Sequence, residues 1–165
     1  MHGPEKIHPH GLADYLEIMS KAVFQTGISW RVVDSKWPGI REAFKGFDPV
    51  AISHFNQKQI DALVEDTRVI RNRHKIVGIA ENAQRMLELD KEHGGFQKYL
   101  RSFGSYEGLV KDLKKQFKFM GDSGIYYFLW VVGEKVPPWE EWNAARTIIK
   151  PKTASTRSRK PSRAG

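Results

Sequence analysis

The sequence predicts an all-α fold, in which helices are joined by short turns. Apolar residues recur three or four positions apart, as they do along one face of a helix, and the alternation typical of strands is nearly absent. With 165 residues and 40% hydrophobic content, the chain can bury one sizeable core. We therefore expect a single helical domain over residues 1–149, followed by a tail over residues 150–165.

The first predicted helix ends at Gly27, because glycine readily takes the left-handed conformation that stops a helix. Its apolar positions fall at helical spacing and are Leu12, Tyr15, Leu16, Met19 and Val23. Asp48 and Pro49 are typical of an N-cap and a first helical position, and so they predict the start of another helix. Asn56 followed by Gln59 resembles a capping box and predicts the next start.

A long helix is predicted between this region and Gly94. Its apolar stripe consists of Ile76, Ile79, Ala80, Ala83 and Leu87. Ser105 is placed to cap a further helix, which leads into residues 117–132. No internal repeat is apparent.

Residues 117–132 are the most informative stretch of the chain. Lysine-rich sequence, with Asp112 as the nearby acid, enters a tight turn at Gly121, and an aromatic helix follows. Such a turn exposes backbone N–H groups that can seat a phosphate. One interpretation is a helix–hairpin–helix that grips a nucleic-acid backbone through Lys118, the amides around Gly121, and Ser123, which we expect to cap the following helix. The other is an ordinary turn between core helices, which this stretch alone favours because glycine turns are common.

The net charge of +8 is concentrated in the predicted tail. Residues 150–165 hold six of the 27 Lys and Arg residues and none of the 19 Asp and Glu residues, so the rest of the chain carries +2. The tail has almost no apolar residues, and we expect it to be disordered. Two interpretations stay open for it, a solubilising terminus and an electrostatic arm that contacts DNA phosphates.

Several classes of protein are disfavoured by composition. No stretch approaches the roughly 20 apolar residues of a membrane span, and the N-terminus has no apolar signal-peptide core. The chain has no cysteine, which excludes disulfides and thiolate metal sites. His2, His8 and His10 are clustered, but a three-His site also needs inward orientation. We expect a cytoplasmic protein with no metal and no cofactor.

An ordered set of motifs spans most of the chain. It consists of Gln25–Trp30, Phe47–Val50, Leu63–Ile76 with Glu81–Ala83 after it, and Phe117–Ser123. In this order the motifs resemble the DNA-3-methyladenine glycosylase I family from about residue 12 to residue 133. The resemblance implies a helix–hairpin–helix base-excision fold, and we expect the protein to be a monomer. It further implies hydrolytic removal of an alkylated purine, 3-methyladenine, from double-stranded DNA by a monofunctional enzyme.

The resemblance assigns roles to residues of the first motif. Trp30 matches the family's base-pocket tryptophan, which would lie against a flipped purine and attract its positive charge. Ile28 matches the wedge that enters the gap in the duplex, and Gln25 is placed for an amide contact with the base. Arg71 and Arg73 belong to a segment expected on the DNA backbone. The alternative for Trp30 is a core aromatic residue.

The chain departs from the family pattern at the catalytic acid. The family's pocket glutamate, eight residues before the tryptophan, is replaced by Ala22, and the cysteines of its structural zinc site are absent. Glu140 is the candidate substitute acid, at the place where the wider superfamily carries a catalytic aspartate. Alternatively, Glu140 only stabilises the first turn of a helix that begins with proline, because an acidic side chain there interacts favourably with the helix dipole. Ser123 stands where lyase members of the superfamily carry a lysine, so we expect no Schiff-base lyase.

Two function classes follow from these residues. The first is the monofunctional glycosylase, which needs little transition-state stabilisation because a cationic base is a good leaving group. The second is a catalytically impaired DNA-binding relative that keeps the hairpin and the base pocket. The hairpin, Trp30 and the segment from Arg71 to Lys75 support both classes equally, and Ala22 favours the second. The first is preferred because the lesion demands little chemistry and the pocket tryptophan is kept. A helical interaction protein without a nucleic-acid role would leave the ordered motifs unexplained.

Overall fold

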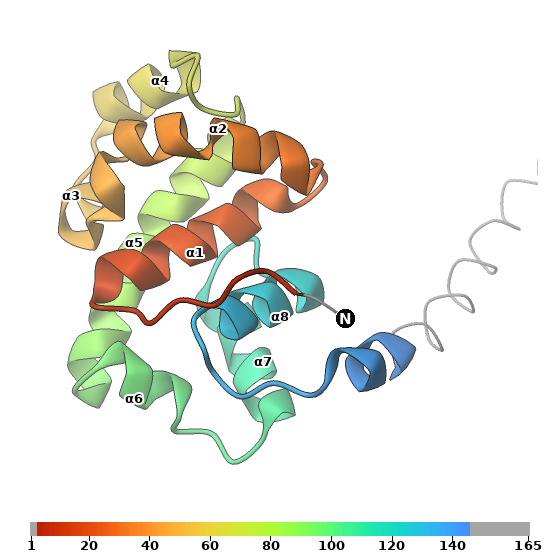
Figure 1. Cartoon of the computed structure of the whole chain (residues 1–165). Helices are drawn as coiled ribbons and strands as arrows, with labels where there is room; N and C mark the ends of the chain where they lie inside the picture. Colours follow the sequence, from red (N-terminus) through yellow and green to blue (C-terminus); the bar gives the residue numbers. More distant parts are fainter. Residues whose placement is uncertain (1–2, 146–165) are drawn as a thin grey trace, which may run out of the picture. The chain divides into compact units, whose positions relative to one another are not determined.

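The computed structural model describes residues 3–145, which form helices and, within that range, no strand (Figure 1). The helices are α1 (Leu12–Gln25), α2 (Trp30–Ala43), the 3-10 turn η1 (Lys45–Phe47), α3 (Pro49–Ser53), α4 (Gln57–Glu65), α5 (Arg73–His93), α6 (Phe96–Leu100), α7 (Tyr106–Gln116) and α8 (Asp122–Val131). A further helical stretch covers residues 139–145. The predicted all-α class is therefore confirmed.

The chain divides into two compact units. One unit, Pro4–Lys135, contains α1 to α8, and the described residues 136–145 belong to the other. The predicted boundary at residue 149 and the basic tail lie outside the described residues. None of the helices in the described range is both long and apolar enough to cross a membrane.

Helix α5 is the longest helix of the larger unit and contacts α1, α3, α4 and α6 (Figure 1). Its buried face differs slightly from the predicted stripe. Met86 and Leu89 are buried, whereas Ala80 and Leu87 are only half-buried, because a 3.6-residue period shifts the inner face along a long helix. The helix ends at Gly94, whose φ of 72° is left-handed, as predicted.

The predicted helix starts are also confirmed. The Asp48 side chain accepts a hydrogen bond from the Val50 amide at 3.1 Å and caps α3. Asn56 and Gln59 form a reciprocal capping box at α4, with both bonds at 2.9 Å. The Ser105 hydroxyl accepts from the Gly108 amide at 3.0 Å at the start of α7. Each cap satisfies an amide that the helix itself leaves unpaired.

Aromatic stacking fixes the end of α2 against α1. The Trp37 and Phe47 rings are parallel within 4° at a centroid distance of 5.4 Å, and Phe44 stacks on Phe47 at 5.1 Å. Phe24 of α1 meets the Trp37 ring edge-on at 6.3 Å. These contacts bury large apolar areas, and they hold the two helices whose connecting loop carries Trp30.

Candidate active site

The loop between α1 and α2 presents Trp30. After α1 ends, Gly27 turns the chain with a φ of 78°, and the Ser29 hydroxyl then accepts a hydrogen bond from the Arg31 amide at 3.2 Å. Trp30 is the first residue of α2, and its side chain is 57% exposed. The alternative of a core aromatic residue is therefore wrong. A large aromatic ring in this position is open to a partner.

Gln25 and Ile28 flank the same loop. Gln25 is the last residue of α1 and is half-buried, and its backbone carbonyl accepts from the Ile28 amide at 3.1 Å. Ile28 is also half-buried, so part of an apolar side chain is presented beside Trp30. This placement is compatible with a wedge, and the contacts of both residues with DNA stay predictions.

A buried lysine holds this loop in place. Lys75, in the first turn of α5, is 6% exposed, and its ammonium donates to the Thr26 carbonyl and lies 3.5 Å from the Phe24 carbonyl. Burial lowers the pKa of Lys75 from its ordinary value. The carbonyls at a helix C-terminus lack intrahelical partners and attract a positive charge, so Lys75 stabilises the end of α1. Pattern reasoning missed this role because the contact spans 49 residues.

The position of the missing glutamate is closed to solvent. Ala22 is 2% exposed, and a Cβ added at Gly124 of α8 would lie 3.6 Å from the Ala22 methyl. Helices α1 and α8 therefore pack closely here, with small residues on both sides. A glutamate at position 22 would need α8 to shift, so we expect Ala22→Glu to disturb packing rather than to restore the family's site.

Polar side chains of α1, α2 and α8 gather near the exposed loop. Lys21 and Asp34 form an ion pair with 2.6 Å between Nζ and Oδ1. The Tyr127 side chain is hydrogen-bonded to the Gln25 side chain. Burial, and then the negative charge of Asp34, raise the pKa of Tyr127 to about 12, so its hydroxyl stays protonated at neutral pH. We call Lys21, Gln25, Asp34 and Tyr127 the polar cluster.

The hairpin between α7 and α8 is anchored on α5. Asn82 is 1% exposed, and its amide both accepts from the Lys118 N–H at 2.7 Å and donates to the Lys118 carbonyl at 3.2 Å. At Gly78 an added Cβ would lie 2.8 Å from the Phe119 ring, so any larger residue there would force that ring to shift. The Lys118 side chain itself is exposed, as a phosphate contact requires.

The prediction that Ser123 caps α8 is wrong. The N-cap is Gly121, no side chain caps the helix, and Ser123 is an exposed second residue of α8. Because Gly121 is extended, with φ −99° and ψ −173°, and forms the N-cap, the helix begins two residues too early for Ser123 to act as a cap. The bare N-terminal amides of α8 are left for another acceptor, which suits a phosphate.

The acid beside the hairpin is also not the expected one. Asp112 accepts a hydrogen bond from the Tyr99 hydroxyl at 2.6 Å, and this bond fixes it within the fold. Asp122, in the first turn of α8, instead forms an ion pair with Lys114 at 2.5 Å. The positive end of the helix dipole stabilises the negative charge of the Asp122 carboxylate. This carboxylate would therefore compete with a phosphate for the N-terminal amides of α8.

Arg71 and Arg73 are exposed but paired. Arg73 contacts Asp61 at 2.7 Å, and the hydrogen bond from Arg73 lowers the pKa of the Asp61 carboxyl. Arg71 lies 3.3 Å from Glu65. Exposed ion pairs of this kind are weak, so either guanidinium can turn to a phosphate at little cost. The DNA contacts of both residues stay predictions.

Glu140 lies in the unit that contains residues 136–145. It is exposed, in the first turn of the helical stretch at 139–145, where the Trp142 amide donates to the Pro138 carbonyl at 3.0 Å. Its catalytic role stays a prediction. Among residues 3–145 no group of three His, Asp or Glu side chains is arranged to hold a metal ion, and His2 lies outside that range.

The geometry of the loop and the hairpin can be compared with known proteins. The family model of the methyladenine glycosylases matches residues 8–116, about two thirds of the chain. This chain belongs to the methyladenine glycosylase family. The match confirms the predicted resemblance and, with it, the predicted enzyme class, a DNA glycosylase of base-excision repair.

Curated relatives agree with the family model. The DNA-3-methyladenine glycosylase of Haemophilus influenzae is 29% identical over 130 residues, which cover 66% of this chain and 70% of the relative. DNA-3-methyladenine glycosylase 1 of Escherichia coli is 30% identical over 130 residues, with the same coverage of both chains.

Solved structures of methyladenine glycosylases share the fold. A crystal structure of 3-methyladenine DNA glycosylase I is 26% identical, with a TM-score of 0.68, and the match covers 77% of this chain and 81% of that one. The enzyme from Staphylococcus aureus, solved to show 3-methyladenine recognition, has a TM-score of 0.70 at 23% identity, with coverage of 78% and 80%. The latter likeness concerns the fold alone.

Proposed function

We propose that this chain hydrolyses the bond between 3-methyladenine and deoxyribose in double-stranded DNA, as a monomer in the cytoplasm. The observation that carries the proposal is the exposed Trp30 at the start of α2, on a loop held by Lys75. An enzyme that excises a base must first extrude it from the stack, and the extruded base needs an aromatic surface to lie on. The names of the curated relatives support the same lesion for this chain.

The charge of the lesion fits the proposed surface. A 3-methylated adenine in DNA is cationic, and the face of a tryptophan ring attracts cations. The guanidinium of Arg31 already lies 5.4 Å from the centre of the Trp30 ring, which illustrates that attraction. A flipped cationic purine would take that place and gain both stacking and charge attraction, whereas a neutral purine would gain stacking alone.

In this proposal, the hairpin and the start of α5 supply the contacts with DNA phosphates. Lys118 and the free amides of residues 121–123, Ser123 included, would bind one phosphate, and Arg71 and Arg73 would reach others. Because Asn82 holds the Lys118 backbone, the hairpin presents these groups in a fixed geometry. Ile28 would fill the gap that the extruded base leaves.

The second candidate function is a DNA-binding relative without catalysis. The observation that favours it is the buried Ala22, which cannot supply the family's carboxylate. A cationic base leaves readily, however, so the chemistry requires less stabilisation than removal of a normal base. The glycosylase therefore remains the better supported function.

Release of free 3-methyladenine decides between the two functions. Duplex DNA treated with a methylating agent is incubated with the protein, and the released bases are separated by chromatography. The glycosylase should release 3-methyladenine in proportion to enzyme and time, and leave abasic sites that alkali cleaves. Binding to the duplex with no release above the spontaneous rate would assign the chain to the DNA-binding relatives instead.

Lys118→Ala should weaken binding to all duplexes alike. The side chain is exposed and its role is electrostatic, so the loss concerns one phosphate contact and no base contact. The slope of log affinity against log salt should become shallower by about one unit. Fluorescence anisotropy over a salt series measures both quantities, and an unchanged slope would remove Lys118 from the interface.

Asp122→Asn is the matched variant with the opposite sign. It removes the carboxylate that competes for the amides of α8 and leaves Lys114 without its 2.5 Å partner. Affinity for undamaged duplex should therefore rise, most strongly at low salt where screening is weak. A fall in affinity would contradict the placement of a phosphate at this helix end.

A further inference from the structure

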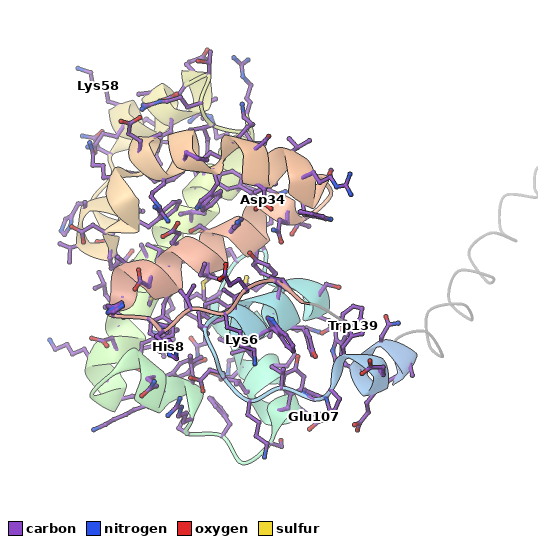
Figure 2. All side chains as sticks on the ribbon, in the orientation of Figure 1. Lys6, His8, Asp34, Lys58, Glu107 and Trp139 are labelled. Atoms are coloured by element: carbon purple, nitrogen blue, oxygen red, sulfur yellow. The ribbon has the colours of Figure 1, made fainter. Side chains whose placement is uncertain are left out.

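The polar cluster contains a carboxylate close to where the family's acid is missing. Asp34 follows Trp30 by four residues on α2, so the two side chains project from the same face of that helix. Figure 2 shows Asp34 on the side of α2 that faces α1. Its side chain is 44% exposed, which leaves the carboxylate open to a ligand beside Trp30.

Helices α1 and α8 complete the surroundings of this carboxylate. Lys21 pairs with Asp34 at 2.6 Å and precedes Gln25 by one helical turn, so both α1 side chains share a face. The Tyr127 side chain is hydrogen-bonded to Gln25, and the negative charge of Asp34 raises the pKa of its hydroxyl. An aromatic face, an acid, an amide and a phenol therefore gather at one place on three helices.

Glu17 is another carboxylate near this cluster, but its hydrogen bonds hold it against α2. Its Oε2 accepts from Trp37 Nε1 at 2.8 Å and from Arg41 at 2.9 and 2.6 Å. The side chain is 13% exposed, so it serves to join α1 to α2. The Asp34 side chain is 44% exposed and its carboxylate pairs with the Lys21 ammonium, so it is more open to a ligand than that of Glu17.

We propose that Asp34 is the carboxylate that faces the cationic purine and its sugar, and that Lys21 is its counter-ion until the base enters. This inference rests on the proposed function and names the acid for it. When a methylated purine enters, its positive charge replaces the Lys21 ammonium, whose long stem lets it turn toward a DNA phosphate. A neutral purine offers no such exchange, so the ion pair also discriminates against undamaged adenine.

The reaction is balanced with water as the other reactant. The bond between C1′ and N9 breaks, and its electron pair moves into the purine ring, which leaves as neutral 3-methyladenine. The sugar becomes oxocarbenium-like, and the Asp34 carboxylate stabilises that charge. Water then adds to C1′, and its proton passes to Asp34 and on to solvent. The products are the free base and an abasic sugar.

Asp34→Asn tests the inference in the full chain. Release of 3-methyladenine from methylated duplex should fall by a factor of about 100 in kcat, while affinity for undamaged duplex and the melting temperature stay near the wild-type values. Glu42→Gln is the matched control, because it removes one negative charge from the same helix at an exposed position. Asp34→Glu should recover part of the rate, since it keeps the charge.

A second variant separates the acid from its partner. Lys21→Met with Asp34→Asn leaves no unpaired lysine, and it should release base as slowly as Asp34→Asn alone. Recovery of the rate in this double variant would overturn the inference, because the unpaired Lys21 would then explain the loss. Wild-type release in Asp34→Asn would overturn it as well, and loss of release in Glu140→Gln alone would assign the role to Glu140. A wild-type protein that releases no base would instead overturn the proposed function, and the inference with it.

Discussion

Trp30→Ala should lower the release of 3-methyladenine by a factor of about 100. Stacking of a base on an aromatic side chain contributes about 1–3 kcal/mol, and attraction of a cationic base places this lesion at the upper end. Because the side chain is 57% exposed, its removal leaves no cavity, and the melting temperature should hardly change. Single-turnover release from methylated duplex and thermal unfolding measure the two quantities.

Trp30→Phe is the control for this variant. Phenylalanine keeps an aromatic face of smaller area and weaker cation attraction, so release should fall only several-fold. Binding to undamaged duplex should be unaffected in both variants, since backbone contacts supply it. Equal rates for Trp30→Ala and the wild type would show that the base is held elsewhere.

Asn82→Leu should lower the stability of the fold far more than the Trp30 variants do. The substitution removes the hydrogen bonds of 2.7 and 3.2 Å to the Lys118 backbone and leaves that N–H and carbonyl facing an apolar side chain. Unpaired buried groups cost about 1–3 kcal/mol each, so we expect the free energy of unfolding to fall by about 2–4 kcal/mol. Affinity for duplex DNA should fall too, because the hairpin is no longer held on α5.

Gln84→Leu is the matched control, since Gln84 is an exposed amide two residues further along α5. Its substitution should change the free energy of unfolding by less than about 0.5 kcal/mol. Denaturant titration gives the stabilities, and anisotropy with duplex DNA gives the affinities. A stable Asn82→Leu protein with normal DNA affinity would contradict the anchoring role of the amide.

Local signals made the helix boundaries predictable. The caps at Asp48 and Asn56 act within three residues of themselves, and Gly94 needs only its own backbone freedom, so the sequence contains all that determines them. The predicted cap at Ser123 is wrong because the start of α8 depends on the backbone of Gly121, which is extended and needs no capping side chain. Residue type alone does not show whether Gly121 or Ser123 is the N-cap of α8.

Long-range contacts explain what the sequence did not reveal. Lys75 reaches a carbonyl 49 residues away, and Asn82 holds a peptide 36 residues away. No local period or motif spacing encodes such partners, and both residues sit in a helix whose pattern explains only burial. Asp34 and Tyr127 come from α2 and α8, so their proximity likewise appears only once the helices are packed.

The contacts of α5 have a mechanical consequence. Lys75 fixes the loop that carries Trp30, and Asn82 fixes the hairpin, on a single helix in which they stand seven residues, or roughly 10 Å, apart. A helix of this kind does not stretch, so the base-binding loop and the phosphate grip keep a constant separation. If both bind DNA as proposed, we expect the duplex to bend and unstack in order to contact them at once. On that basis, we expect damaged sites that deform easily to bind in preference to undamaged DNA before any base reaches Trp30, so that the stiffness of the DNA would contribute to selectivity.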